Sequence, residues 1–198
     1  MKVIPAETAV QEAVRILNQP GSVLLVPTET VYGLVCSWND AAARTRIYEL
    51  KHRAENKPFA AFIPDVSALP SEALLPEAAS RLAARFCPGP ITLVVPDRNG
   101  GTFGFRIPDH PFILALLKQF GGALASTSAN LSGQPPARNV EYGLQSIDGE
   151  VDLAVDGGPL PPDSPASTVV QVFADSTWKI LRHGPIPAER IAEAVSGR

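Results

Sequence analysis

Short apolar runs alternate with helical stripes along the chain, and turn residues separate them. The apolar runs predict strands at about residues 23–26, 34–36, 59–63, 91–95, 103–107, 123–125, 151–155, 168–172 and 179–181. Stripes and end signals predict helices over about residues 9–17, 40–50, 76–86, 111–120 and 139–145, and from about 188 onward. Thr8-Ala-Val-Gln11 has the form of a capping box for the first helix. Several strands are neighbours in sequence, which favours a single α/β domain with a mixed sheet and flanking helices.

Composition narrows the class of protein. The 198 residues are 45% hydrophobic and 19% charged, without repeat or linker, so we expect one globular domain over residues 1–198. A net charge of -3 argues against a general nucleic-acid coat but allows a local basic pocket. Two cysteines and three histidines without metal spacing predict neither a disulfide framework nor a protein-held metal. No signal peptide or bilayer-spanning run is found, so no membrane association and a cytoplasmic location are expected.

A polar segment follows the first predicted strand. Pro27 to Leu34 reads P-T-E-T-V-Y-G-L and places two hydroxyls and a carboxylate at the strand end, where open α/β sheets bind ligands. The alternative is a polar turn in which Thr28 and Thr30 bond the local backbone.

Three cations lie between residues 51 and 57, directly after a predicted helix. Lys51, Arg53 and Lys57 could simply complement the helix dipole at a solvated end. They could instead form a phosphate clamp, with Arg53 as a planar fork and the lysines as point charges. Pro58 and the apolar run that follows tie this loop to the sheet, which favours the clamp.

The segment from Ser126 to Gly133 reads S-T-S-A-N-L-S-G and has four hydroxyls and an amide after a buried strand. Such a loop can direct several donors into one concavity, as anion nests do. It lacks the Gly-Lys-Ser/Thr of a Walker loop, and the alternative is an ordinary Ser/Thr turn.

Arg106 is a cation on a largely apolar strand and therefore needs a partner. That partner is either an internal carboxylate such as Glu29 or the carboxylate of a ligand. Arg182 ends a later strand in the same way. Cys87 has no histidine nearby in sequence, so a buried structural thiol is expected there rather than a nucleophile.

Six motifs in this order resemble the threonylcarbamoyl-AMP synthase family, the YrdC-type domain. They are P-T-E-T-V-Y-G-L from Pro27, K-H-R from Lys51, C-P-G-P-I-T from Cys87, R-I-P from Arg106, S-T-S-A-N-L-S-G from Ser126, and S-T-V-V from Ser167 with R-H-G from Arg182. The resemblance implies a twisted sheet curved around one large cationic cavity. It also implies a nucleotidyltransferase that makes threonylcarbamoyl-adenylate and pyrophosphate from L-threonine, bicarbonate and ATP with Mg²⁺, for a downstream transferase that modifies tRNA.

The resemblance also implies residue roles. Threonine contacts are expected from Thr30, Arg106, Ser126 and Ser167, and ATP contacts from Lys51, Arg53, Lys57, Thr102, Ser128, Asn130 and Arg182. Lys51 and Arg53 are the expected catalytic residues. Phe62 stands where some relatives carry a threonine-contacting histidine, and some carry asparagine at Lys57. Longer relatives have a second domain that clamps the cavity, so the short form is expected here.

Two other functions fit the same sequence. One is an RNA-binding module that uses the cationic cavity without catalysis, which would also account for a direct tRNA contact. The other is a paralogue with a different carbamoyl or acyl-adenylate substrate. The intact K-H-R and S-T-S-A-N segments favour the synthase.

Overall fold

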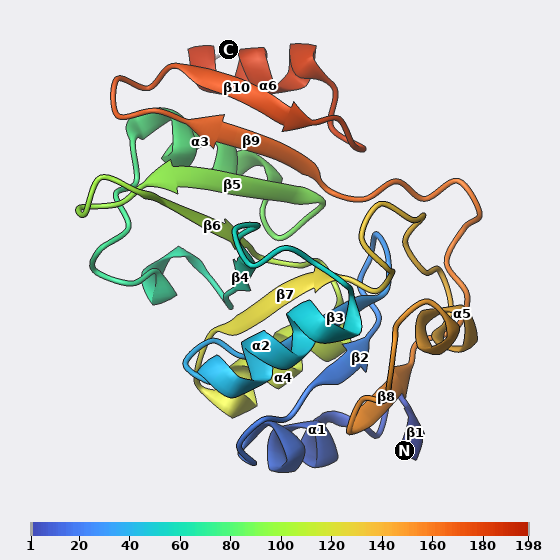
Figure 1. The fold of residues 1–198 in the computed structure, drawn as a ribbon. Helices are drawn as coiled ribbons and strands as arrows, with labels where there is room; N and C mark the ends of the chain where they lie inside the picture. Colours follow the sequence, from blue (N-terminus) through green and yellow to red (C-terminus); the bar gives the residue numbers. More distant parts are fainter. Residues whose placement is uncertain (1, 198) are drawn as a thin grey trace.

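Ten strands form one mixed sheet in the computed structural model, which describes residues 2–197 (Figure 1). Their order is β1-β8-β2-β3-β7-β4-β6-β5-β9-β10. The strands are β1 (Lys2–Pro5), β2 (Leu24–Val26), β3 (Gly33–Ser37), β4 (Ala60–Phe62), β5 (Ile91–Pro96), β6 (Thr102–Arg106), β7 (Leu124–Ser128), β8 (Leu153–Asp156), β9 (Thr168–Val172) and β10 (Trp178–Arg182). The helices are α1 (Val10–Leu17), α2 (Ala41–Leu50), α3 (Glu77–Phe86), α4 (Pro111–Phe120), α5 (Val140–Gln145) and α6 (Ala188–Ser196), with a 3-10 turn η1 (Val66–Ala68). The predicted α/β fold with a mixed sheet is confirmed.

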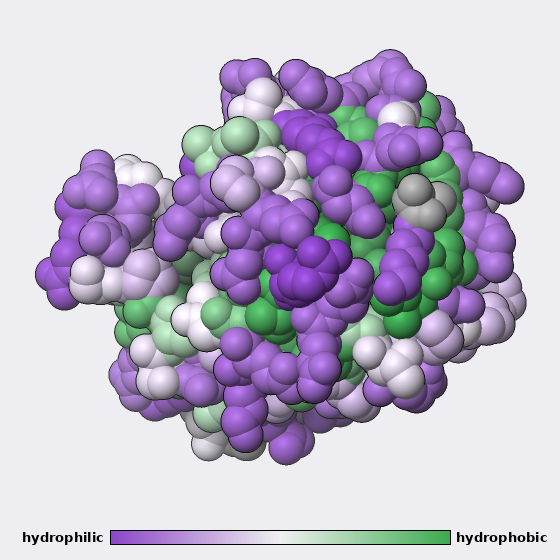
Figure 2. Space-filling model, turned by 90° about the horizontal axis from the view of Figure 1, so that it is seen from below, coloured by the Kyte–Doolittle hydropathy of each residue, from purple (hydrophilic) through white to green (hydrophobic). Residues whose placement is uncertain are grey.

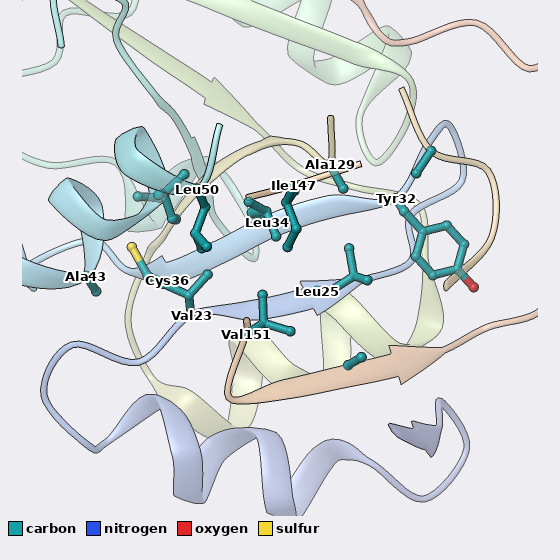
Figure 3. Close-up of a cluster of buried hydrophobic side chains, with 14 of the residues drawn as sticks. Val23, Leu25, Tyr32, Leu34, Cys36, Ala43, Leu50, Ala129, Ile147 and Val151 are labelled. Atoms are coloured by element: carbon teal, nitrogen blue, oxygen red, sulfur yellow. The ribbon is translucent and has the colours of Figure 1, made fainter. Parts of the chain in front are cut away.

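Helices cover both faces of the half of the sheet that contains β8, β2, β3 and β7. Successive side chains of a strand point to opposite faces. Leu24 of β2 therefore packs with α1 and α4, while Leu25 packs with α2 and α5, and both are fully buried. Figure 3 shows Val23, Leu25 and Leu34 in the cluster that faces α2 and α5. Burial on both faces explains why the sequence of β2 is a continuous apolar run.

The other half of the sheet has helices on one face only. On β5, Ile91, Leu93 and Val95 belong to the hydrophobic cluster built with α3 and α6. The alternate residues, Thr92 and Val94, line a cavity on the opposite face. The open face of β4, β6, β5 and β9 is therefore the floor of the candidate site (Figure 1).

One expectation at the N-terminus was wrong, and one strand there was not predicted. Helix α1 has Ala9 as its N-cap and no side-chain cap, while the Thr8 hydroxyl donates to the Pro5 carbonyl at 3.3 Å, so the capping box is not formed. Strand β1 was not predicted because it is mostly exposed and lacks an apolar run; it pairs in parallel with β8. Helix α2 is capped by Asp40, whose side chain accepts from the Ala43 amide at 2.9 Å.

The hydroxyl-rich segment is partly strand, not entirely loop as predicted. Strand β7 continues through Ser128, and Ser126 and Ser128 pair with Val35 and Gly33 of β3. The pairing fixes the direction of both hydroxyls, which a free loop would not do. The loop begins only at Ala129.

The molecular surface near α1 and β1 is mostly hydrophilic, with a hydrophobic area on one side (Figure 2). Val3 of the edge strand β1 is exposed. Between residues 2 and 197, no helix is both long and apolar enough to cross a bilayer.

Candidate functional site

A cavity of about 510 Å³ lies over the open face of the sheet. This volume falls in the range of small-molecule sites, about 300–1,000 Å³. Three guanidinium groups lie on its walls, those of Arg53, Arg106 and Arg182. Hydroxyl groups from strand ends and aromatic side chains complete the walls, among them Thr28, Thr92, Thr102, Ser126, Thr127, Ser128 and Ser167, with Trp38, Phe59, Phe62 and Phe103.

The predicted site residues divide into two groups. Those on the cavity wall are Arg53, Thr102, Arg106, Ser126, Ser128, Ser167 and Arg182. Thr30, Lys51, Lys57 and Asn130 are not part of the wall. The structure thus gathers residues from segments more than a hundred positions apart, and it places part of the predicted set behind or beside the cavity.

Arg106 has the internal partner that its position on β6 requires and also faces the cavity. Its Nη2 lies 2.7 Å from Glu29 Oε1 and donates to Thr30 Oγ1 at 2.9 Å. The Phe62 ring lies below the guanidinium, 5.7 Å from its carbon to the ring centroid. The neighbouring Phe105 is buried in the core, as strand alternation demands. Arg106 therefore pairs with the internal carboxylate of Glu29 and can also contact the carboxylate of a ligand in the cavity, the two partners considered from the sequence.

Thr28 and Thr30 form a hydroxyl pair beneath this guanidinium. Their oxygens are 3.0 Å apart, and Thr28 also donates to the Val31 carbonyl at 2.7 Å. The Thr28 oxygen accepts from the Thr30 and Val31 amides as well. The local turn that the sequence offered as the alternative to a ligand site is therefore present, and it holds Thr30 against Arg106.

Arg182 is fixed against Ser167. Its Nε and Nη2 donate to the Ser167 carbonyl at 3.0 and 2.9 Å, and Nη2 reaches the Ser167 hydroxyl at 3.0 Å. The same hydroxyl is 2.8 Å from that of Thr92 on β5. Gly184 allows this approach, because a Cβ there would lie 2.4 Å from the Thr168 nitrogen. Burial, and then the nearby Arg106 cation, lower the pKa of Arg182.

Lys51 lies behind the wall rather than on it. Its ammonium donates to the carbonyls of Ser128 and Asn130, the latter at 2.6 Å, and lies 3.3 Å from Asn130 Oδ1. Burial, and then the charge of Arg53, lower its pKa to about 7. Asn130 Oδ1 in turn accepts from the Ser128 hydroxyl at 2.6 Å. In this arrangement Lys51 and Asn130 hold the loop that presents Ser128, and a direct phosphate contact of either stays a prediction.

Arg53 reaches the cavity wall from the loop after α2. Its Nη2 donates to the Pro58 carbonyl at 3.0 Å, and burial lowers its pKa. Lys57 is exposed, and its carbonyl rather than its ammonium joins the local network, accepting from Tyr48 at 2.9 Å. The ATP contact expected of Lys57 therefore stays a prediction that needs its side chain to turn toward the cavity.

Several wall residues were not predicted from the sequence. Trp38 and Phe103 form an edge-to-face pair with centroids 5.3 Å apart. Thr92 is the last residue of the C-P-G-P-I-T motif and lies in a predicted strand, and its place in this motif was the signal that could have identified it. Trp38 had no such signal, because nothing in its neighbourhood in sequence is unusual.

Neither thiol is suited to nucleophilic chemistry. Burial raises the pKa of Cys36 to about 12 and that of Cys87 to about 11, so both are protonated at neutral pH. In the part of the chain that the structure describes, no cluster of three or more His, Cys, Asp or Glu side chains could hold a metal ion. What the cavity offers is positive charge and hydrogen-bond donors, an arrangement that binds and orients anions.

Comparison with known proteins identifies relatives of this chain. The chain matches the profile of the Sua5/YciO/YrdC family, described as "Telomere recombination", over residues 16–184. It is 37% identical over 192 residues to threonylcarbamoyl-AMP synthase from Bacillus subtilis, a match that covers 91% of this chain and 55% of that protein. The chain thus spans about half the length of this curated relative.

Solved structures agree with the sequence match. The structure of P. abyssi Sua5 complexed with L-threonine superposes with a TM-score of 0.87 at 31% identity, covering 100% of this chain and 61% of that one. E. coli YciO superposes with a TM-score of 0.83 at 25% identity, covering 96% of this chain and 98% of that one. With the family profile matched over most of its length, the chain belongs to the Sua5/YciO/YrdC family.

Proposed function

We propose that the protein is a threonylcarbamoyl-AMP synthase, a nucleotidyltransferase that uses L-threonine, bicarbonate and ATP. The observation that carries this proposal is one cavity of about 510 Å³ with three guanidinium groups and a series of hydroxyls on its walls. Relatives named threonylcarbamoyl-AMP synthase in B. subtilis, mouse and P. abyssi support it.

The amino acid would bind at Arg106. Its guanidinium faces the cavity and can hold a planar carboxylate by two parallel hydrogen bonds. Ser126 and Ser167 also line the wall, and Thr30 anchors the guanidinium from behind. The related P. abyssi Sua5 was solved with L-threonine, which supports an amino-acid site in this fold.

The nucleotide would bind between Arg53 and Arg182. Guanidinium groups suit phosphate oxygens, and Ser128 and Thr102 add hydroxyl donors. The aromatic pair of Trp38 and Phe103 offers an apolar wall for the adenine ring. Mg²⁺ would enter as the ATP complex, held mainly by phosphates and water.

The chemistry needs no covalent enzyme intermediate. The threonine amine attacks the carbon of carbon dioxide and loses a proton, which gives a carbamate. With bicarbonate, a carbon–oxygen bond also breaks, and the leaving hydroxide and the amine proton depart as water. A carbamate oxygen then attacks the α-phosphorus, the bond from the α-phosphorus to the bridging oxygen breaks, and pyrophosphate leaves. The cavity would contribute positioning and charge neutralisation, with Arg53 facing the charge that develops on the phosphates.

The product, threonylcarbamoyl-adenylate, would pass to a transferase that modifies a tRNA adenosine. Such an activated acid is short-lived in water, so a direct transfer partner is expected. Whether RNA itself contacts the protein is a separate question, and the charge of -3 favours transfer of the small molecule over a broad RNA-binding surface.

Mass spectrometry of the reaction products tests the proposal. The protein is incubated with MgATP, L-threonine and ¹³C-bicarbonate, and we expect an adenylate that carries one heavy carbon together with pyrophosphate. The Arg53→Ala variant should lose the product, whereas Lys118→Ala, a change of an exposed lysine on α4, serves as the matched control. An adenylate without the heavy carbon would indicate a different acyl substrate, and no adenylate at all would refute the synthase assignment.

A further inference from the structure

Glu29 is the only carboxylate paired with a cavity cation among residues 2–197. Its Oε1 lies 2.7 Å from Arg106 Nη2, and the two side chains are 18% and 6% exposed. In such a site two charges interact much more strongly than they do in water. The charge of Glu29 therefore offsets that of Arg106 before any ligand binds.

The pair is incompletely satisfied. Neither Glu29 oxygen receives a well-directed hydrogen bond from the residues that the structure describes, although both are shielded from solvent. Arg106 Nε likewise has no acceptor among them. Buried polar atoms of this kind normally have partners. The missing partners are one acceptor for Arg106 and donors for Glu29.

An α-amino acid suits this pair of opposite charges. Its carboxylate can accept from Arg106, which lines the cavity, and its ammonium, attached to the adjacent carbon, is attracted by the negative charge of Glu29 beside that arginine. A simple carboxylic acid satisfies only Arg106 and brings a second negative charge next to Glu29. Like charges in a shielded site repel, so such a ligand is disfavoured.

On the basis of this geometry and of the proposed function, we propose that Glu29 is a specificity-determining residue that makes the Arg106 site selective for zwitterionic amino acids. Glu29 attracts the ammonium and rejects carboxylates that lack one. This role goes beyond holding Arg106 in place, because the charge of Glu29 raises the affinity for zwitterionic amino acids and lowers the affinity for carboxylates without an amine.

Equilibrium binding of two ligands to the Glu29→Gln variant tests the proposal. The ligands are L-threonine and 3-hydroxybutanoate, which is threonine without its amine. Glutamine has the same shape but no charge, so the threonine affinity should fall about tenfold, the loss of one attractive charge interaction in a shielded site. The affinity for 3-hydroxybutanoate should stay the same or rise. Glu189→Gln, at an exposed carboxylate of α6, is the matched control.

Other outcomes overturn the proposal. A parallel fall for both ligands would mean that Glu29 only positions Arg106, and unchanged affinities would mean that it plays no part. If Glu29→Gln does not fold, the double variant Glu29→Gln/Arg106→Gln removes both charges of the pair, a change that buried pairs often tolerate. It must then lose any preference for threonine over 3-hydroxybutanoate, and a retained preference refutes the role.

The proposed function is tested separately in the unaltered protein. If that protein forms no labelled adenylate but binds threonine better than 3-hydroxybutanoate, the synthase assignment fails while the role of Glu29 stands. If it forms the adenylate but shows no preference between the two ligands, only the role of Glu29 fails.

Discussion

Replacement of Arg106 by lysine separates the ligand-binding role of this residue from its structural role. The charge is kept, but the planar fork is lost. In the structure, Nη2 alone serves both Glu29 at 2.7 Å and Thr30 at 2.9 Å, which leaves the part of the guanidinium that faces the cavity for a ligand. A lysine ammonium cannot reach both internal partners and also hold a carboxylate by two parallel bonds.

The size of the effect follows from these contacts. One charged hydrogen bond is worth about 1.5–3 kcal/mol, so threonine should bind about ten- to a hundredfold more weakly. A loss of similar size is expected in stability, because the bond to Thr30 or the pairing with Glu29 is loosened. For a domain of this size that corresponds to a fall in Tm of about 3 to 12 °C. ATP affinity measured without threonine should hardly change.

Calorimetry with each ligand and a thermal melt, all on one preparation, check this prediction. Arg85→Lys, at an exposed arginine of α3, controls for the exchange itself. A folded Arg106→Lys protein with unaltered threonine affinity would mean that Arg106 does not hold the substrate. A matching loss of ATP and threonine affinity would mean that Arg106 acts only through the structure of the cavity.

Three further predictions concern the clamp, the thiols and Lys51. Arg53→Ala should weaken ATP binding by about 1.5–3 kcal/mol and threonine binding much less, as measured by calorimetry; an unchanged ATP affinity removes Arg53 from the clamp. Cys36→Ala/Cys87→Ala should keep turnover within a few-fold, and a folded but inactive double variant would revive covalent catalysis. Burial lowers the pKa of Lys51 to about 7 in the folded protein. Between pH 7 and 10 the unfolded chain therefore binds more protons at this residue than the folded protein does. The free energy of unfolding should rise with pH over this range, by at most about 1.4 kcal/mol per pH unit. Denaturant titrations should show this rise, and Lys51→Met should flatten it.

The strands of the core could be predicted because burial leaves a direct trace in the sequence. A strand such as β2, buried on both faces, is a continuous apolar run, and Asp40 before α2 is a recognisable cap. Strand β1 leaves no such trace, since it forms by backbone pairing with β8 while its side chains remain largely exposed. Thr8 was misassigned because the helix begins one residue later than a Thr8 cap requires: Ala9 is the N-cap, and the Thr8 hydroxyl donates to the Pro5 carbonyl instead.

The site was harder to predict, because side-chain direction depends on local backbone geometry. Lys51 and Arg53 are two positions apart and look equivalent in sequence. His52 between them has φ of 47°, a left-handed conformation that is unusual for a residue other than glycine. Lys51 lies buried behind the wall and Arg53 reaches the cavity, so the two cations of the K-H-R motif have different surroundings. The family resemblance implied a cationic cavity, but only the structure separates the residues of its wall from those that support the wall.

The positive charges that make the cavity suitable for anions are energetically unfavourable when no ligand is bound. Burial lowers the pKa of both Arg53 and Arg182, and Arg106 lowers that of Arg182 further, which means that the fold disfavours these cations relative to water. Glu29 offsets only the charge of Arg106. A triphosphate placed between Arg53 and Arg182 would offset the cost of burying both cations and the repulsion of Arg182 by Arg106. The free energy that the protein gives up to hold these cations in an otherwise acidic chain is thus recovered on binding, which favours ligands with several negative charges over neutral ones.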